Sequence, residues 1–227
     1  MVLEAKGIEK WYFRKKGGAN RFWAVKKTDV SFLPGTLTVL TGRSGSGKTT
    51  LMHMLGGILR PDTGSVLADG QDLYAMHDRE LSVFRNRHTG MMPQGADVLG
   101  DLTVMENLQL PGGIVPGTEK EERMRMSEEL LERMEISTLA QVRAKELSGG
   151  ERRRVCLVRA LAGQPDLIIA DEPTSDLDDT SMQLVLRELR RAADKGAAVI
   201  VVTHDLEALS YADRHLVMTA GELQTPV

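Results

Sequence analysis

The stretch that decides the fold runs from residue 36 to residue 50 and reads Thr36-Leu-Thr-Val-Leu-Thr-Gly42-Arg-Ser-Gly-Ser-Gly47-Lys48-Thr49-Thr50. Its first six residues are apolar or β-branched, a composition typical of a buried strand. The glycine-rich part fits the pattern Gly-x4-Gly-Lys-[Ser/Thr] in full. Residues 49–59 are compatible with a helix. A strand, a glycine loop and a helix in this order predict a phosphate-binding loop on a parallel α/β sheet.

Each residue type in this loop has a task along a nucleotide's phosphate chain. The glycines allow several backbone N–H groups to turn toward the phosphates, and the following helix adds its positive N-terminal end. We expect Lys48 to bridge the β- and γ-phosphates, the Thr49 hydroxyl to bind Mg²⁺ and Thr50 to contact the α-phosphate. The predicted nucleotide-binding residues of the loop are Gly42, Arg43, Ser44, Gly45, Ser46, Gly47, Lys48, Thr49 and Thr50.

Two further apolar runs also end in polar, chemically capable residues. Residues 167–170 lead into Asp171-Glu172-Pro173, and residues 198–202 lead into Thr203-His204-Asp205. Parallel strands carry their ligands at their carboxyl ends, so all three runs are expected to deliver groups to one site. We expect Asp171 to hold Mg²⁺ through water. Glu172 should point elsewhere, because side chains alternate on a strand, and it is the candidate to polarise the attacking water.

The remaining segments predict two additions to this core. Residues 2–6, 24–32 and 65–68 are short and β-prone, and we interpret them as an antiparallel layer packed against the nucleotide core. Helix signals dominate residues 95–160, where we place an inserted helical lobe. Its clearest helix covers residues 119–134, with Met124, Ser127, Leu131 and Met134 on one apolar face, which we interpret as core packing.

Length and composition exclude several classes of protein. With 227 residues the chain can bury one large core. Its net charge of −3 gives no basic field for nucleic acid, so no nucleic-acid partner is expected. The single cysteine, Cys156, excludes an internal disulfide framework and suits a reducing compartment. The N-terminus has no secretory pattern and no apolar run approaches the ~20 residues of a spanning helix, which predicts a soluble, cytoplasmic chain.

A second glycine element precedes the acidic strand end and narrows the function. It reads Leu147-Ser148-Gly149-Gly150-Glu151 and opens a helix-competent run. Ser148 can cap that helix, and the two glycines leave N–H groups exposed at its positive end. A capped helix alone would explain the serine but not both glycines. The chain therefore carries two elements suited to gripping the phosphates of one nucleotide.

With both glycine elements and the acidic strand end in place, the sequence resembles the ATP-binding-cassette (ABC) ATPases over essentially the whole chain. The resemblance implies an α/β fold of the P-loop NTPase (RecA-like) type in a single domain, residues 1–227. Its core would span about residues 1–94 and 161–227, with the antiparallel β layer, and the helical lobe about residues 95–160. It also implies ATP and Mg²⁺ as ligands and ATP hydrolysis as the reaction.

The family motifs can be placed on this chain one at a time. Gln94 in Met91-Met-Pro-Gln94 matches the Q-loop glutamine that senses Mg²⁺ and the attacking water. Asp178 ends Ser175-Asp-Leu-Asp178, which matches the D-loop at the dimer interface, and His204 matches the switch histidine at the γ-phosphate. Tyr12 matches the aromatic residue that stacks on adenine, although its neighbour Trp11 could serve instead.

In this family the signature of one subunit completes the nucleotide site of another. The resemblance therefore implies that Ser148, Gly149, Gly150 and Glu151 bind the nucleotide held by a second copy, in a head-to-tail dimer with two sandwiched ATP molecules. It also implies an integral membrane permease subunit as partner, which would hold this chain at the inner face of the cell membrane. Lys48, Gln94, Glu172 and His204 are the predicted catalytic residues, and Thr49, Gln94 and Asp171 the predicted Mg²⁺ ligands.

Three details make the chain most like the cassettes of the macrolide-exporter and lipoprotein-release group. They are Glu151 in place of the more usual glutamine, the segment 51–57 after the phosphate loop, and the segment 102–111 after the Q-loop. The leading hypothesis is an ATPase subunit that drives export or mechanotransmission of the lipoprotein, macrolide or antimicrobial-peptide type. A soluble cassette ATPase outside transport is the alternative. A regulator without hydrolysis is disfavoured, since no catalytic residue is visibly missing.

Overall fold

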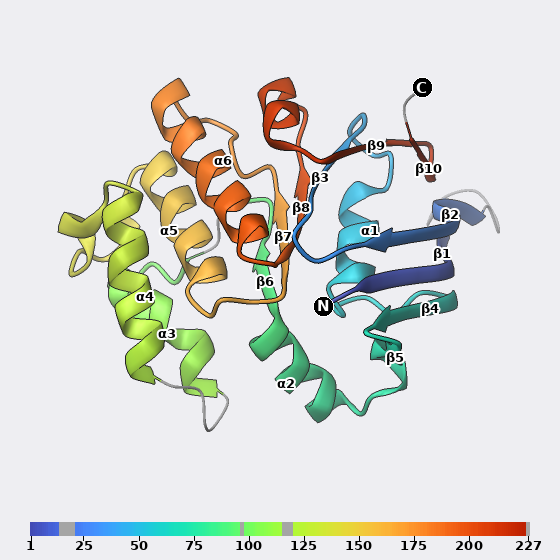
Figure 1. Cartoon of the computed structure of the whole chain (residues 1–227), viewed down its shortest axis with the longest axis horizontal. Coiled ribbons are helices and arrows are strands. Elements are labelled where there is room, and N and C mark those ends of the chain that lie inside the picture. The colour runs from blue at the N-terminus through green and yellow to red at the C-terminus, as the bar shows by residue number, and fades with distance from the viewer. Residues whose placement is uncertain (14–20, 96–97, 115–119, 226–227) are drawn as a thin grey trace.

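The structure is a computed structural model of the chain, and it describes residues 1–13, 21–95, 98–114 and 120–225. Residues 14–20, between the first two strands, lie outside the described part. Strands and helices alternate along the chain, as expected of an α/β fold. Long segments separate the third strand from the sixth and the sixth from the seventh (Figure 1).

A six-stranded sheet forms the centre of the molecule. Its order is β10-β9-β3-β8-β7-β6, and β3, β6, β7, β8 and β9 run parallel to their neighbours while β10 pairs antiparallel at one edge. Of the inner strands, β7 and β8 are buried throughout and β3 is buried except at Thr41, as their continuous apolar sequences predict. Their bounds are β3 Leu37–Thr41, β6 Thr89–Met92, β7 Leu167–Asp171, β8 Ala198–Val202, β9 Arg214–Thr219 and β10 Glu222–Gln224.

Alternate residues of these strands enter two different cores. On β8, Val199 and Val201 belong to the core beneath the helices α5 (Gly149–Leu161) and α6 (Asp179–Asp194), while Ile200 and Val202 face the core around helix α1 (Lys48–Leu55). Figure 1 shows the same division, with α1 on one side of the sheet and α5 and α6 on the other. Both faces of the sheet are therefore covered, which rules out a solvated face on the central strands.

A second sheet, of four strands, packs beyond α1. Its order is β2-β1-β4-β5, and its pairs are antiparallel, as the sequence predicts for this layer. The first two strands are longer than expected, because they extend outward as a ribbon past the segments 2–6 and 24–32. Their bounds are β1 Leu3–Phe13, β2 Arg21–Phe32, β4 Thr63–Ala68 and β5 Gln71–Asp72, followed by a 3₁₀ turn at Leu73–Ala75 and helix α2 at Asp78–His88.

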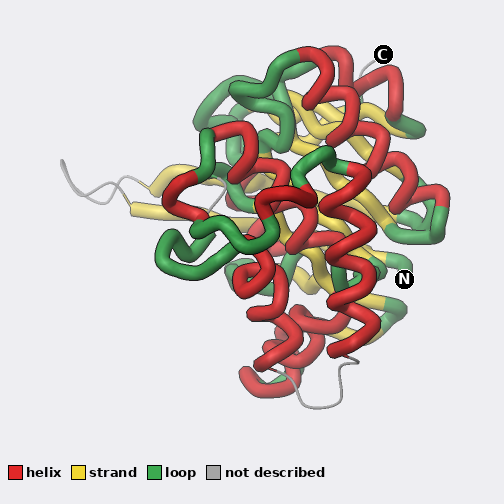
Figure 2. Tube along the Cα trace, turned by 90° about the vertical axis from the view of Figure 1, so that its left-hand side faces the viewer, coloured by secondary structure: helices red, strands yellow, loops and turns green. Residues whose placement is uncertain are grey.

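Helices dominate the segment between β6 and β7, and Figure 2 shows them in front of the strands. Helix α3 covers Val104–Ile114 and α4 covers Lys120–Arg133, with short 3₁₀ turns at Ser137–Leu139 and Ala144–Glu146 before α5 and another at Leu206–Tyr211 after β8. One detail of the predicted helix is wrong. Met124 is 42% exposed and Arg123 is buried in its place, while Ser127, Leu131 and Met134 are buried as expected.

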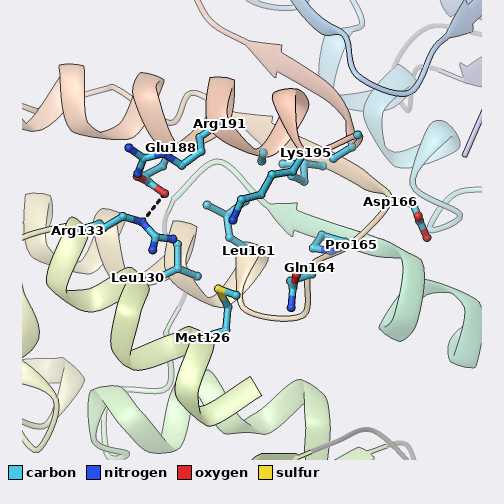
Figure 3. A pocket seen from close by; sticks show the side chains of 14 residues that line it. Met126, Leu130, Arg133, Leu161, Gln164, Pro165, Asp166, Glu188, Arg191 and Lys195 are labelled. Carbon is cyan, nitrogen blue, oxygen red and sulfur yellow. Dashed lines mark hydrogen bonds and ion pairs between the residues drawn. The ribbon is translucent and has the colours of Figure 1, made fainter. Parts of the chain in front are cut away.

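A buried ion network ties the lobe to the core. The Arg133 Nε atom on α4 lies 3.0 Å from Glu188 Oε2 on α6, and Arg191 pairs with the other carboxylate oxygen of Glu188. Glu188 is only 5% exposed, and the attraction of the two cations offsets the free-energy cost of burying its charge. Figure 3 shows these ion pairs at the wall of a hollow of about 190 Å³, and Met126 and Lys195 also line that hollow.

The central position of β8 generates a stability prediction. Ile200 is fully buried, so Ile200→Ala should lower the free energy of unfolding by about 2–5 kcal/mol and Ile200→Val by about 0.5–1.5 kcal/mol. The melting temperature should fall by roughly 2–4 °C for each kcal/mol lost. Leu206→Ala, at a position that is 69% exposed, is the matched control and should melt with the wild type. An Ile200→Ala chain that also melts with the wild type would contradict this packing.

Candidate functional site

The carboxyl ends of β3, β7 and β8 meet at one edge of the central sheet. The register places Leu40 opposite Val202, and Val202 opposite Asp171, so the segments that follow these strands begin at the same level. A hollow of about 630 Å³ opens there. It is lined by Tyr12, Phe22, Trp23, Ala24, Gly42, Arg43, Ser44, Gly45, Gly47, Lys48, Thr49, Thr50, Gln94, Asp171, Glu172, Ser175 and His204.

The glycine loop between β3 and α1 has the backbone that its sequence requires. Gly45 and Gly47 have φ angles of 75° and 110°, in the left-handed region that favours glycine. A Cβ at Gly47 would also come within 2.0 Å of the Ala24 carbonyl oxygen, so no side chain fits there. Lys48 Nζ donates to the carbonyl oxygens of Gly42 and Arg43, at 2.7 and 3.2 Å. The lysine charge is thereby held over the loop, where a phosphate chain would lie.

Ser46 is the one loop residue of the predicted set that does not line the hollow. It is buried, and its Oγ atom has no hydrogen-bond partner among the described residues. Its backbone takes part in holding the loop, because Gly221 N donates to Ser46 O at 2.9 Å. The other eight predicted loop residues lie together in the hollow.

Asp171 lies at the back of the hollow, beside the start of α1. Thr49 Oγ1 donates to Asp171 Oδ2 at 3.0 Å. The carboxyl group is buried, and burial raises its pKa; the Thr49 hydrogen bond lowers it in part, and the neighbouring charge of Glu172 raises it further. A hydroxyl and a carboxylate so close together form a pair of hard oxygen ligands. Gln94, which follows β6, lines the same hollow and is exposed.

Glu172 and His204 form a pair on the other side of the hollow. The His204 Nδ1 atom lies 3.1 Å from Glu172 Oε1 and 3.0 Å from Oε2. The hydrogen bond to Glu172, and then the charge of that carboxylate, raise the pKa of His204. Thr203 Oγ1 and Ser175 Oγ also approach the Glu172 carboxylate, at 3.3 and 3.4 Å. The carboxylate is thus held by three side chains.

Asp171 and Glu172 have different partners, and strand alternation is not the reason. The strand ends at Asp171, and Glu172 has a φ angle of 51°, a left-handed conformation that is unusual for glutamate. Its amide nitrogen donates to Val202 O at 2.7 Å, which fixes the turn. Strained backbone of this kind collects at functional sites, and here it turns the carboxylate toward His204.

The structure distinguishes between the two aromatic candidates at the outer end of the hollow. Tyr12 is 38% exposed and lines the hollow. Trp11 does not line it, and the Arg21 guanidinium lies 3.6 Å from the centre of the Trp11 ring. Of the two residues only Tyr12 lines the hollow, which favours Tyr12 as the stacking residue.

Besides Ser46, five predicted residues lie outside this hollow. Ser148 caps α5: its Oγ accepts from Glu151 N at 3.3 Å and donates to Glu151 Oε2 at 2.8 Å, and the hydrogen bonds from Ser148 lower the pKa of Glu151. Asp178 also caps a helix, α6, accepting from Ser181 N at 2.9 Å. These five residues are Ser148, Gly149, Gly150, Glu151 and Asp178. Within one chain they do not reach the phosphate loop's site.

Sequence reasoning missed other residues that line the hollow. Phe22 and Trp23 on β2 lie opposite Tyr12 and Trp11 on β1, and the Tyr12 and Phe22 rings are 5.8 Å apart. The aromatic pairs on both sides of the segment 14–20 were a signal for this antiparallel register. Ser175 was placed only in the D-loop, yet it also contacts Glu172.

Comparisons with known proteins agree with this geometry. The family model described as ABC transporter matches residues 25–175. The lipoprotein-releasing system ATP-binding protein LolD of Buchnera aphidicola is 35% identical, over 98% of this chain and 96% of its own length. The macrolide export ATP-binding/permease protein MacB 2 of Aeromonas hydrophila is also 35% identical, over 98% of this chain but 34% of its own length.

Solved structures match the whole fold. The dimeric structure of MJ0796, a bacterial ABC transporter cassette, is 29% identical with a TM-score of 0.89, covering 98% of both chains. A dimeric post-hydrolysis state of the same cassette, bound to ADP and Pi, has a TM-score of 0.87, covering 99% of this chain and 98% of its own. The family match, the relatives that align over nearly the whole of this chain and the hollow at the phosphate loop lead to one conclusion: the chain belongs to the ABC transporter family, as an ATP-binding, ATP-hydrolysing cassette.

Proposed function

We propose that this cassette works as a dimer of two identical chains and drives export or mechanotransmission through a separate membrane subunit. One observation carries the proposal: the phosphate loop, Asp171, Glu172 and His204 share one hollow, while the signature at Ser148 does not line it. A chain with an unused phosphate-gripping element is suited to serve the hollow of a second copy. The dimeric cassettes of MJ0796 support that arrangement.

In the proposed site the chain's own residues divide the work of hydrolysis. The loop N–H groups and Lys48 hold the phosphates, and Tyr12 stacks on the adenine. Glu172, held by His204, orients the water that attacks the γ-phosphate, and Gln94 positions that water from the segment after β6, at the same end of the sheet. Thr49 and Asp171 fit Mg²⁺, because their oxygens lie 3.0 Å apart at the expected place of the β- and γ-phosphates. When bound, the ion would neutralise charge on the phosphates.

The membrane partner and the location follow from the relatives. Among the described residues no helix is long and apolar enough to cross a membrane. The relatives named above are a lipoprotein-releasing subunit and a macrolide exporter that carries its permease in the same chain. We infer that this chain pairs with a separate permease subunit, lies at the inner face of the membrane and moves a lipoprotein, macrolide or antimicrobial peptide. These relatives give no support to the alternative of a soluble cassette outside transport.

The role of Glu172 can be tested by replacing its carboxylate with an amide. Glu172→Gln should lower ATP turnover by about 10²-fold or more, because the group that orients the water is lost. ATP binding should persist, and ATP should now hold a stable dimer in size-exclusion chromatography. The exposed Glu207→Gln, close by in the 3₁₀ turn, is the matched control. Undiminished turnover in Glu172→Gln would overturn the assigned role.

The shared site can be tested at the signature. Ser148→Arg places a bulky cation at the N-terminus of α5, so it should abolish ATP-dependent dimerisation and lower turnover about tenfold or more while leaving ATP binding to the monomer unchanged. Equilibrium binding of a fluorescent ATP analogue and light scattering measure the two effects separately. Ser137→Arg, at another exposed serine of the lobe, is the control. A Ser148→Arg chain that dimerises and hydrolyses normally would refute the shared site.

A further inference from the structure

The backbone turn that carries Glu172 is held from two sides. On the side of the sheet, Glu172 N donates to Val202 O on β8 at 2.7 Å. On the other side, Arg153 on the signature helix α5 donates through Nη1 to Glu172 O. Ser175 N also approaches that carbonyl oxygen, but at 3.4 Å, near the outer limit of a hydrogen bond. Arg153 therefore makes the closer of these two contacts to the Glu172 carbonyl group.

The conformation of this turn requires contacts from outside it. Glu172 and Asp176 have φ angles of 51° and 59°, in the left-handed region that residues other than glycine rarely adopt. Such backbone persists only where the surrounding structure stabilises it. Two of these residues lie within five positions of each other, in the short segment between β7 and α6. The hydrogen bond from Arg153 is one of the contacts that can hold the segment, and it comes from a different element.

The first turns of α5 place Arg153 at this segment. Gly150 lies three residues before it, and residues three apart share a face of a helix. An added Cβ at Gly150 would come within 3.2 Å of Leu177 Cδ2, so this face of α5 lies directly against the segment 175–178. The Arg153 side chain is only 11% exposed in this contact. Further along the helix, buried residues of α5 share one core with those of β7, which fixes the helix beside the turn.

The hydrogen bond to the carbonyl group matters more than the ion pair that accompanies it. Arg153 Nη2 lies 3.7 Å from Asp176 Oδ2, but the Asp176 side chain is 89% exposed, and exposed ion pairs contribute little to stability. A buried guanidinium requires acceptors, and a hydrogen bond from a charged donor is roughly twice as strong as one between neutral groups. Loss of the bond to Glu172 O is therefore the change expected to loosen the turn.

We propose that Arg153 is a positioning residue for Glu172. By holding the carbonyl group of the turn, it keeps the Glu172 carboxylate beside His204, where the attacking water is oriented. The inference rests on the proposed function, because it presupposes that Glu172 orients that water. Arg153 also lies five residues after Ser148 on the same helix. One side chain thus joins the signature, which serves a second copy, to the glutamate of the chain's own site.

The test replaces Arg153 by methionine, which keeps a long unbranched side chain but has no donor. Arg153→Met should lower the single-turnover rate of ATP hydrolysis about tenfold or more, because misplacing a catalytic group by about 1 Å costs up to about 10²-fold. The KM for ATP and the melting temperature should stay close to those of the wild type, since the phosphate loop is unchanged. Arg153→Lys keeps a charged donor and should recover most of the rate. Arg187→Met, at an exposed position of α6, is the control and should hydrolyse ATP normally.

A double mutant separates positioning from a structural role. In the Glu172→Gln chain the group that Arg153 positions is already lost, so adding Arg153→Met should not lower the residual rate further. ATP should still hold the double mutant as a dimer in size-exclusion chromatography, which checks that the fold, the ATP site and the signature are intact. Two effects that multiply would mean that Arg153 acts independently of Glu172, and the inference would be wrong.

The remaining outcomes are also distinguishable. Normal turnover in Arg153→Met, a loss of turnover that follows a loss of ATP binding, or an Arg153→Lys chain as slow as Arg153→Met would each overturn the positioning role. Asp176→Asn should lower the rate only about twofold, because that pair is exposed. A larger loss there than in Arg153→Met would assign the effect to the ion pair and overturn the role of the carbonyl bond. The proposed function fails only if Glu172→Gln alone leaves turnover undiminished.

Discussion

The parallel pairing of β3, β8 and β7 is the constraint on which the rest of the molecule depends. It brings the phosphate loop, Asp171 with Glu172, and Thr203 with His204 to one edge of the sheet, although more than a hundred residues separate the first from the others. Burial on both faces fixes this register, because a shift by one residue would exchange the side chains that face the two cores. The functional side chains at this edge of the sheet thus meet because the buried strands pack in this register.

The same architecture leaves the site incomplete within one chain. The signature helix α5 packs on the opposite face of the sheet from α1, so Ser148 cannot reach the loop that α1 begins. At the N-terminus of α5 the side chains of Ser148 and Glu151 each accept a hydrogen bond from the other residue's backbone N–H, and Ser148 remains exposed at the surface of the lobe. An ion pair between Arg133 on α4 and the buried Glu188 on α6 joins the lobe to the core.

Much of the fold and of the site could be predicted from the sequence, because the signals lie in short local stretches of the chain. Continuous apolar runs that end in Asp171, Thr203 or Gly42 identify buried parallel strands and their active edge without any knowledge of distant contacts. The capping role of Ser148 was equally local, because it depends on residues three apart. What failed depended on tertiary context. The exposure of Met124 and the burial of Arg123 follow from how α4 packs on Gly163, and the left-handed turn at Glu172 depends on the hydrogen bond that its amide donates to β8.

The central claim is that each nucleotide site combines the loop of one chain with the signature of another. A structure of the Glu172→Gln chain with ATP and Mg²⁺ tests it most directly. The account predicts two chains head to tail, with Ser148 Oγ of one at hydrogen-bond distance, about 3 Å, from a γ-phosphate oxygen held by the residues 42–50 of the other. An ATP molecule enclosed by a single chain, with Ser148 of both copies facing solvent, would contradict it.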